Sequence, residues 1–386
     1  MKTSSSAGCY GHAPDLMPPQ APRASGRRCP MKPLALLSTL TAAAQKRLLW
    51  IMLLAYALAA SRPEPGLALR SVTPLHLGGT ALPLQAGLLA AVVFNAGLTA
   101  RTEALPALLR HPRALLVGIT ANALLPSVLL AVGAVAADGW HNPHEAQSLL
   151  VGLALVGAMP VAAGATVFAQ GSEGNATLTL GLVIGSTLLS PLTIPLGLHL
   201  GGFLASGPYA ADLHAAAAHA CGAFAVLAVV LPCALGLLLG RLLTAHRPGL
   251  LAAALPVVKA VNLGVVVLLS YTNACGGLGQ VVARPDPDFL LLVAVAAAAM
   301  CGGSFLTGWV LAARLGLPRA DAIALAYASG MNNSSAGAVV AVTRIPGNPA
   351  VLVPILAYSL LQKVLASLLG AFVRHARFGD ESSVVP

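Results

Sequence analysis

The sequence contains little charge and few aromatic side chains. Charged residues make up 9% of the 386 residues and aromatic residues 4%, whereas 57% are apolar and the mean hydropathy is +0.82. A water-soluble domain carries roughly 25% charged residues, so most of this chain must lie where charge is unfavourable. The composition therefore predicts an integral membrane protein whose first partner is the lipid bilayer.

Cysteine pairs and catalytic motifs are also missing from the sequence, which argues against a metal-binding protein and against an enzyme. The six cysteines form no C-x-x-C pair, and His111 and His141 lie in expected loops without a partner at ligand spacing, so we expect no metal site. The sequence has no H-E-x-x-H motif, no aspartate pair within an apolar run and no Ser/His arrangement, which argues against an enzyme. The formal net charge of +10 comes from basic residues between apolar runs, so we expect no nucleic-acid partner.

Charged residues divide the apolar chain into ten candidate membrane spans. A helix needs about 20 residues to cross ~30 Å of hydrocarbon. The uncharged run 174–211 is too long for one helix and must contain a loop near Gly201–Pro208. The expected spans are 47–61, 76–100, 114–137, 148–171, 175–200, 217–241, 256–276, 288–313, 320–342 and 349–373.

Basic residues predict the orientation of these spans. With both chain ends in the cytoplasm, most Lys and Arg fall on the cytoplasmic side, and the outer segments contain only Arg62, Arg70, Arg284 and Arg344. This asymmetry follows the positive-inside rule. We expect a multi-pass protein of the bacterial inner (plasma) membrane with cytoplasmic N- and C-termini.

An internal repeat relates the two halves of the chain. Ala163–Val167 matches Ala336–Val340, and the Gly-Asn pair at 174–175 matches the pair at 347–348, both at an offset of 173 residues. Because each half holds five spans, an odd number, the second half enters the membrane from the opposite side. Such an inverted repeat is typical of secondary transporters. The expected division is a disordered basic tail at 1–45, repeats at 46–208 and 209–375, and a C-terminal tail at 376–386.

Glycine and proline interrupt the fourth and ninth spans. We expect helix breaks at Pro160 and Gly164 in the fourth span and at Gly330 in the ninth. A helix break at membrane depth leaves backbone groups that lipid cannot satisfy, so it occurs where it lines an enclosed or water-filled cavity. Two breaks that cross near the midplane would build a binding site, and the positive ends of their half-helices suit an anionic substrate.

Polar side chains near the two breaks are the candidate ligands of a substrate or ion. Each could instead bond backbone groups that the break frees, or join neighbouring helices. Asn95 and Asn122, in other spans, are expected to make hydrogen bonds between helices. The candidates are Thr166, Thr177, Thr179, Ser329, Asn332, Asn333, Ser334 and Ser335.

Lys363 adds a positive charge to the last span. At 1.5 Å per residue it lies about 15 Å from the cytoplasmic end of the span. An unpaired ammonium at this depth is unfavourable by at least a few kcal/mol. The ammonium could stand in for a bound cation and neutralise an anionic substrate, or the side chain could snorkel to the headgroups.

Four motifs resemble the bile acid:sodium symporter family, within the bile/arsenite/riboflavin transporter superfamily. The resemblance covers roughly residues 46–375 and implies ten helices in a panel and a core domain, with broken helices four and nine crossing, and sodium-driven uptake of organic anions. The motifs are F-N-A-G-L-T at 94–99, P-V-A-A-G-A-T followed by E-G-N-A-T-L-T within 160–179, S-T-L-L-S-P-L-T-I-P at 186–195 and G-M-N-N-S at 330–334.

The sequence departs from this family at the positions that ligate sodium. The family's ninth helix reads E-x-G-x-Q-N, and here Ala328 replaces the Glu while Asn332 shortens the Gln. Ala165-Thr166 matches a Ser-Asn pair of the fourth helix, and Val183 takes a hydroxyl position of the fifth. Sodium prefers several oxygen ligands and some negative charge. We therefore expect no cofactor, with sodium as the candidate ion but weakened or absent sodium coupling.

The sequence thus predicts a secondary transporter of a small organic anion. The alternative is a transport-inactive receptor, sensor or scaffold on the same fold. An arsenite efflux carrier is less favoured, because it would need a thiolate on the fourth span where Val161 stands. The substrate's identity and the oligomeric state are left open.

Overall fold

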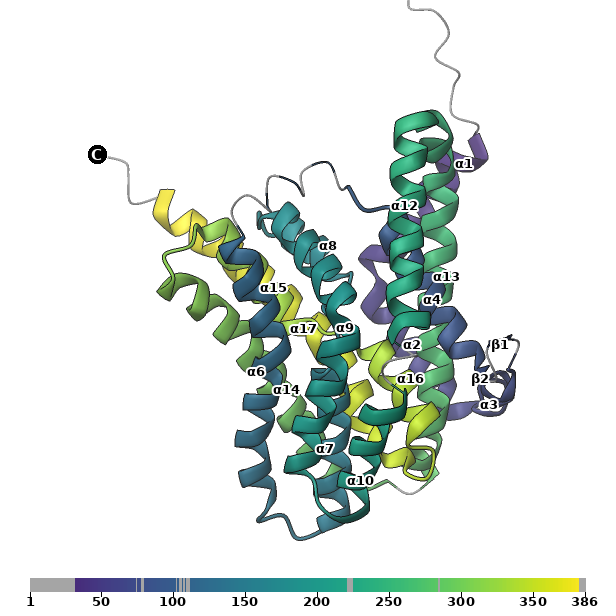
Figure 1. Ribbon diagram of the computed structural model, residues 1–386, viewed down its shortest axis with the longest axis vertical. Helices are drawn as coiled ribbons and strands as arrows, with labels where there is room; N and C mark the ends of the chain where they lie inside the picture. The colour runs from purple at the N-terminus through teal and green to yellow at the C-terminus, as the bar shows by residue number, and fades with distance from the viewer. Residues whose placement is uncertain are drawn as a thin grey trace, which may run out of the picture.

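The computed structural model describes residues 32–381 except for 74, 78–79, 102, 104–105, 107, 109–111, 221–224 and 284. The described chain is almost entirely helical (Figure 1), which confirms the predicted all-α class. One small antiparallel hairpin joins β1 (Leu75–Leu77) to β2 (Thr80–Leu82). The expectation of a helix from residue 76 is therefore wrong, and the helix of that span begins at Leu84.

Six helices of the described chain are long and apolar enough to cross a membrane, which makes this an integral multi-pass protein. The third, fifth, sixth, seventh, eighth and tenth expected spans correspond to them. In order they are α6 (Arg113–Ala137), α9 (Ala176–Leu204), α12 (Leu231–His246) with the π-helical segment Ala225–Val230 before it, α13 (Pro248–Ala283), α14 (Pro287–Arg314), and α17 (Leu352–Glu381) with the 3-10 turn Pro349–Val351 before it.

Shorter helices complete the chain. The first two meet at an angle of 75°, and counting that bent pair as one span would give a seventh candidate among the described residues. Two further pairs are separated by short breaks and take the places of the fourth and ninth expected spans. The shorter helices are α1 (Lys32–Lys46), α2 (Leu48–Ser61), α3 (Glu64–Ser71), α4 (Leu84–Leu98), α7 (Pro143–Gly157), α8 (Ala165–Gly171), α10 (Gly207–Ala215), α15 (Arg319–Gly330) and α16 (Ser334–Arg344), with a π-helical segment at Ala216–Ala220.

Both expected tails require correction where the structure describes them. Residues 32–45 belong to α1, which packs against α13. The apolar residues between Lys32 and Lys46 are numerous enough to give this helix an apolar face. At the other end α17 continues through 376 to Glu381. Residues 1–31 and 382–386 lie outside the described residues. The loop expected near Gly201–Pro208 lies between the end of α9 and the start of α10.

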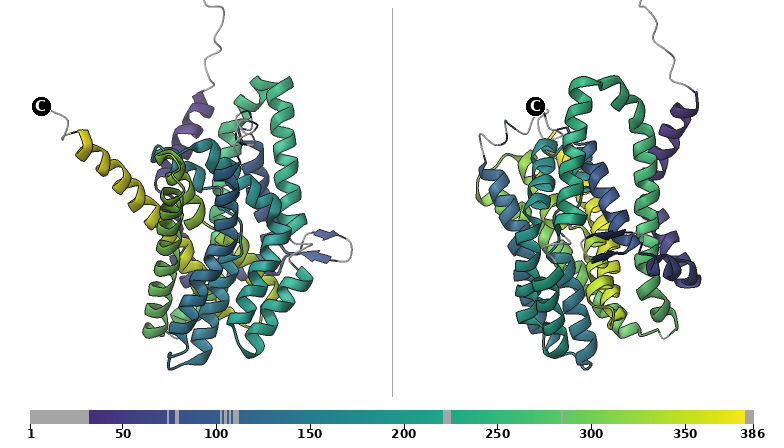
Figure 2. Two further views of the ribbon diagram at one scale, coloured as in Figure 1. Left: turned by 60° about the vertical axis from the view of Figure 1, so that its left-hand side comes forward. Right: turned by 45° about the vertical axis from the view of Figure 1, so that its right-hand side comes forward.

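The helices pack in two groups, seen side by side in Figures 1 and 2. The α13 group contains α1, α2, α3, α4, α12 and α13, with α4 against α12 and α2 against α13. The α9 group contains α6 to α10 and α14 to α17, and it includes both broken pairs. The two groups meet where α17 contacts α2 and α13 and where α16 contacts α13 and α4. There Leu356 of α17 joins a buried apolar cluster with Met52 and Tyr56 of α2.

Glycines bring α4 and α12 into close contact. A Cβ atom at Gly97 would lie 2.5 Å from the carbonyl oxygen of Cys233, and one at Gly240 would lie 2.6 Å from that of Leu98. A Cβ at Gly236 would overlap the carbonyl oxygen of Phe94. Small residues allow helix backbones to approach this closely, and van der Waals contact then holds helices together within lipid.

We expect Gly236→Ala to destabilise the protein by about 1–3 kcal/mol, since the added methyl group would push α4 and α12 apart. The check is the thermal unfolding midpoint of the purified protein in detergent. Gly133→Ala on α6 is the matched control, because nothing lies within 4 Å of the added methyl group. An equal fall in midpoint for both variants would contradict the close packing of α4 on α12.

Candidate functional site

The breaks of the two interrupted helix pairs are short non-helical stretches of chain. One covers residues 158–164 between α7 and α8, and the other covers 331–333 between α15 and α16. Pro160 stands inside the first break, where it has no N–H to continue a helix. Gly164 is the cap residue before α8, and Gly330 is the last residue of α15.

Main-chain hydrogen bonds join the two breaks. The N–H of Ala162 donates to the carbonyl of Met331 at 2.8 Å, and the N–H of Asn333 donates to the carbonyl of Pro160 at 2.9 Å. This is the pattern of a short antiparallel β bridge. The bridge satisfies backbone groups that lack an intrahelical partner at the ends of the half-helices. The two breaks therefore cross in direct contact, and we call this contact the crossing.

An asparagine pair packs beside the crossing. The Nδ2 of Asn122 on α6 donates to the Oδ1 of Asn332 at 2.8 Å, and the Asn332 side chain is fully buried. The Nδ2 of Asn332 finds no acceptor among the described residues. A buried donor without a partner is unfavourable by about 1–3 kcal/mol. A bound molecule with an acceptor oxygen would remove that penalty.

Serines of α9 face the first break from the other side. The N–H of Val161 donates to the Oγ of Ser186 at 3.1 Å. Ser190, one turn further along α9, is fully buried and its Oγ lacks a hydrogen-bond partner in the described structure. Neither serine was among the candidate residues. Both belong to the S-T-L-L-S-P-L-T-I-P motif, so the signal was present in the sequence.

The candidates on the ninth span have different surroundings. Asn333 caps α16 by accepting a hydrogen bond from the N–H of Ala336 at 3.2 Å. Ser334 accepts one from the Nε2 of Gln362 on α17 at 3.3 Å. Ser329 is buried against Gly308 with no partner for its Oγ in the described structure, and Ser335 is half-buried.

The threonine candidates lie on α8 and α9. The Oγ1 of Thr166 donates to the carbonyl of Ala163 at 2.8 Å, and that of Thr179 to the carbonyl of Asn175 at 2.9 Å. Thr177 is half-buried on the first turn of α9. Thr166 and Thr179 thus make local bonds within their own segments rather than bonds to the crossing.

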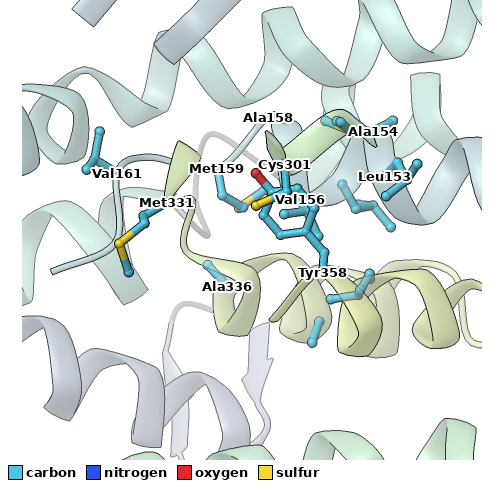
Figure 3. Packing of buried hydrophobic residues seen from close by; sticks show 14 of the residues in the cluster. Leu153, Ala154, Val156, Ala158, Met159, Val161, Cys301, Met331, Ala336 and Tyr358 are labelled. Atoms are coloured by element: carbon cyan, nitrogen blue, oxygen red, sulfur yellow. The ribbon is translucent and has the colours of Figure 1, made fainter. Parts of the chain in front are cut away.

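Helix α17 borders the crossing. The hydroxyl of Tyr358 donates to the carbonyl of Gly330 at 3.2 Å, and the Cys301 thiol of α14 donates to the same carbonyl at 3.5 Å. Figure 3 shows Cys301 beside the end of the Tyr358 side chain, with Met159 close by. Lys363, further along α17, is half-buried and donates from Nζ to the Ser359 carbonyl at 2.7 Å.

The positions that match the family's sodium ligands are apolar and buried. Ala165 and Ala328 are fully buried, and Val183 is 7% exposed. Among the described residues, the side chains of Asp288, Asp321 and Glu145 bond to residues outside the crossing, namely His141, Asn175 and Trp140. Methyl groups cannot coordinate a cation, so this set of side chains does not fit the sodium site that the resemblance describes.

A polar cluster at the surface corrects one expectation. His141, expected to have no partner at ligand spacing, pairs with Asp288 at 3.0 Å, and Glu145 lies within 4.8 Å of both ligand atoms. Glu145 already accepts hydrogen bonds from Trp140 and Asn142, so the cluster is a hydrogen-bond network at the first turns of α7 and α14. The side-chain hydrogen bond that Asp286 shares with Asp288 raises the pKa of Asp286.

The asparagine pair can be tested by its coupling energy. We expect Asn122→Ala and Asn332→Ala each to lower stability, and the double variant to lose about 1 kcal/mol less than the sum of the two, because the pair shares one hydrogen bond. Thermal unfolding in detergent measures the stabilities of the wild-type protein, both single variants and the double variant, which together form the double-mutant cycle. The matched control pair is Asn95 and Asn262, which meet at 3.4 Å in the α13 group. Strict additivity for Asn122 and Asn332 would contradict the buried bond.

Comparison with known proteins places the chain in a family. It matches the model of the Sodium Bile acid symporter family over residues 86–284, from α4 to the end of α13. It is 27% identical over 282 residues to the uncharacterized protein YbaS of Bacillus subtilis (strain 168), covering 72% of this chain and 85% of that one. It is 26% identical over 300 residues to the uncharacterized sodium-dependent transporter YocS of the same organism, covering 76% and 84%. The resemblance found in the sequence is confirmed, and the chain belongs to the sodium bile acid symporter family.

Proposed function

We propose that the protein is a secondary transporter that binds a small organic anion at the crossing. The observation that carries this proposal is the pair of main-chain hydrogen bonds between the two breaks, at 2.8 and 2.9 Å, in a chain of a symporter family. Irregular backbone at membrane depth is tolerated where it lines a site, and transporters commonly bind their substrates between discontinuous helices.

Ten spans and an inverted repeat are part of the proposal. Adding α2, α4 and the two broken pairs to the six long helices gives ten crossings. The offset of 173 residues carries Gly157, the end of α7, onto Gly330, the end of α15. It also carries Gly171, the end of α8, onto Arg344, the end of α16. These matches support two repeats at 46–208 and 209–375.

The same proposal assigns the helix groups and the orientation. The α13 group would be the panel domain and the α9 group the core domain that the family resemblance implies. The distribution of Lys and Arg supports cytoplasmic termini in a bacterial inner membrane. α1 would then precede the first repeat.

The chemistry of the crossing favours an anion. The unpartnered Nδ2 of Asn332 is a donor, and α16 directs its positive N-terminal end at the break. Among the described residues, Asp288 and Asp321 bond to His141 and Asn175 outside the crossing, so neither carboxylate opposes a negative charge there. A carboxylate could accept the hydrogen bond that Asn332 leaves unused.

Sodium coupling is weakened or absent in this proposal. The name of YocS describes that relative as sodium-dependent, whereas Ala165, Val183 and Ala328 leave this chain without three of the family's ligand side chains. The remaining oxygens are carbonyls and hydroxyls without a formal charge. Dehydrating sodium for such a set is less favourable than for one that includes a carboxylate.

Uptake into proteoliposomes tests the function. The purified protein is reconstituted and offered labelled carboxylates, including pyruvate, pantothenate and bile acids, with sodium or with N-methylglucamine as the external cation. We expect saturable uptake and counterflow of at least one carboxylate, with less than about a twofold effect of sodium. Liposomes without protein are the control.

Two results would contradict parts of this proposal. A strict sodium requirement would overturn the weakened coupling while keeping the transporter. Saturable binding without counterflow would favour the transport-inactive receptor instead.

A further inference from the structure

Helix α17 presents two neighbouring faces to the rest of the molecule. Tyr358 and Gln362, one turn apart, contact the two sides of the second break at Gly330 and Ser334. Residues 356 and 360 lie on the adjacent face and pack in the apolar cluster shared with α2 and α13. Helical spacing puts residues 359 and 363 on that second face. Lys363 therefore lies where the crossing meets the seam between the two helix groups.

Within the part of the chain that the structure describes, the Lys363 ammonium pairs with Ser359 and not with a carboxylate. The ion pair found in the described residues is His141 with Asp288, at the surface. Lys363 donates instead to the carbonyl of Ser359 at 2.7 Å and to its Oγ at 3.4 Å. The Cys301 thiol, which itself donates to the break, lies within electrostatic range. A positive charge with only neutral neighbours at this depth remains uncompensated.

The direction of the side chain argues against snorkelling to the nearer membrane surface. Arg374, the next basic residue of α17, lies towards the C-terminal end, roughly 16 Å along the helix axis at 1.5 Å per residue. Lys363 points the other way, because both of its hydrogen bonds go to Ser359, one turn towards the N-terminal end. The ammonium is thus held deeper in the bundle than its own Cα.

Gln362, the residue before Lys363, has a buried side-chain oxygen without a hydrogen-bond partner in the described structure. Its Nε2 donates to Ser334, while its Oε1 is buried without a donor in the described structure. Its side chain is 3% exposed. Together with the free Nδ2 of Asn332, this leaves polar atoms on both sides of α16's first turn without partners. Polar atoms of this kind are normally satisfied in a loaded site by water or ligand.

We propose that Lys363 is the cationic subsite for the substrate, and that its ammonium leaves Ser359 to pair with the single carboxylate of a monocarboxylate bound at the crossing. This inference rests on the proposed function and names its substrate class. The fixed charge takes the place of a co-transported cation, so binding needs no sodium. One ammonium neutralises one carboxylate, and a second carboxylate on the substrate would remain uncompensated.

Ligand-induced thermal stabilisation of the purified full-length protein tests this subsite in sodium-free buffer. The probes are pyruvate, pantothenate and a bile acid, each beside its methyl ester, and succinate as a dicarboxylate. A ligand that binds the folded state stabilises it in proportion to the logarithm of its concentration over Kd. We expect at least one monocarboxylate to bind wild-type protein at least tenfold more tightly than its ester and than succinate.

The decisive variant is Lys363→Met, which removes the charge while keeping a long apolar side chain that suits the bundle. We expect it to weaken monocarboxylate binding at least tenfold and to leave ester binding unchanged. Lys259→Met, at an exposed position of α13, is the matched control and should change neither. A variant that fails to fold would be replaced by Lys363→Gln, for which the expectation is the same.

Several outcomes would overturn the subsite. They are unchanged carboxylate binding by Lys363→Met, equal loss of acid and ester binding, a sodium requirement for binding, succinate bound as tightly as the monocarboxylates, and absence of stabilisation by every carboxylate. Failure of the proposed function looks different. Wild-type protein would then bind a monocarboxylate through Lys363 without moving it across proteoliposomes.

Discussion

Two main-chain hydrogen bonds at the crossing are the constraint on which the rest of the structure depends. A helix that stops within lipid leaves donors and acceptors that water cannot reach, and each would be unfavourable by about 1–3 kcal/mol if unpaired. Ala162 and Asn333 donate across the gap to Met331 and Pro160, so each break completes the other. The buried side chains around them, drawn in Figure 3, exclude competing water. Neither break would be stable without its partner.

Partners for the crossing come from helices that are far apart in the sequence. Asn122 reaches it from α6, Ser186 from α9, Cys301 from α14 and Tyr358 from α17. Ser186 accepts from the N–H of Val161, Asn122 bonds the Asn332 side chain, and Cys301 and Tyr358 share the carbonyl of Gly330. The α9 group therefore forms around the two broken pairs, and apolar clusters and close glycine contacts pack both groups.

The sequence predicted the long helices well because an apolar stretch long enough to cross a membrane can be recognised from that stretch alone. Span 114–137 differs from α6 by one residue, and span 288–313 from α14 by one at each end. The hairpin at 75–82 was missed because apolar content outweighed the bracketing Pro74 and Pro83. The breaks were visible through glycine, proline and the repeat. The role of Gln362 was not visible, because a polar residue in an apolar helix acquires its role from the face it presents, which only tertiary packing determines.

The bridge between the breaks also restricts how the molecule can change shape. Main-chain bonds tie the two broken pairs together, so under the proposed function alternating access would arise from sliding of the α9 group, with both pairs in it, along the α13 group. The seam between them contains the side-chain hydrogen bond between Tyr56 of α2 and Ser359, the residue to which Lys363 donates. Any sliding there strains the contact that positions the ammonium. Under the proposal, Ser359 would therefore affect both the position of the Lys363 ammonium and the movement of the α9 group along the α13 group.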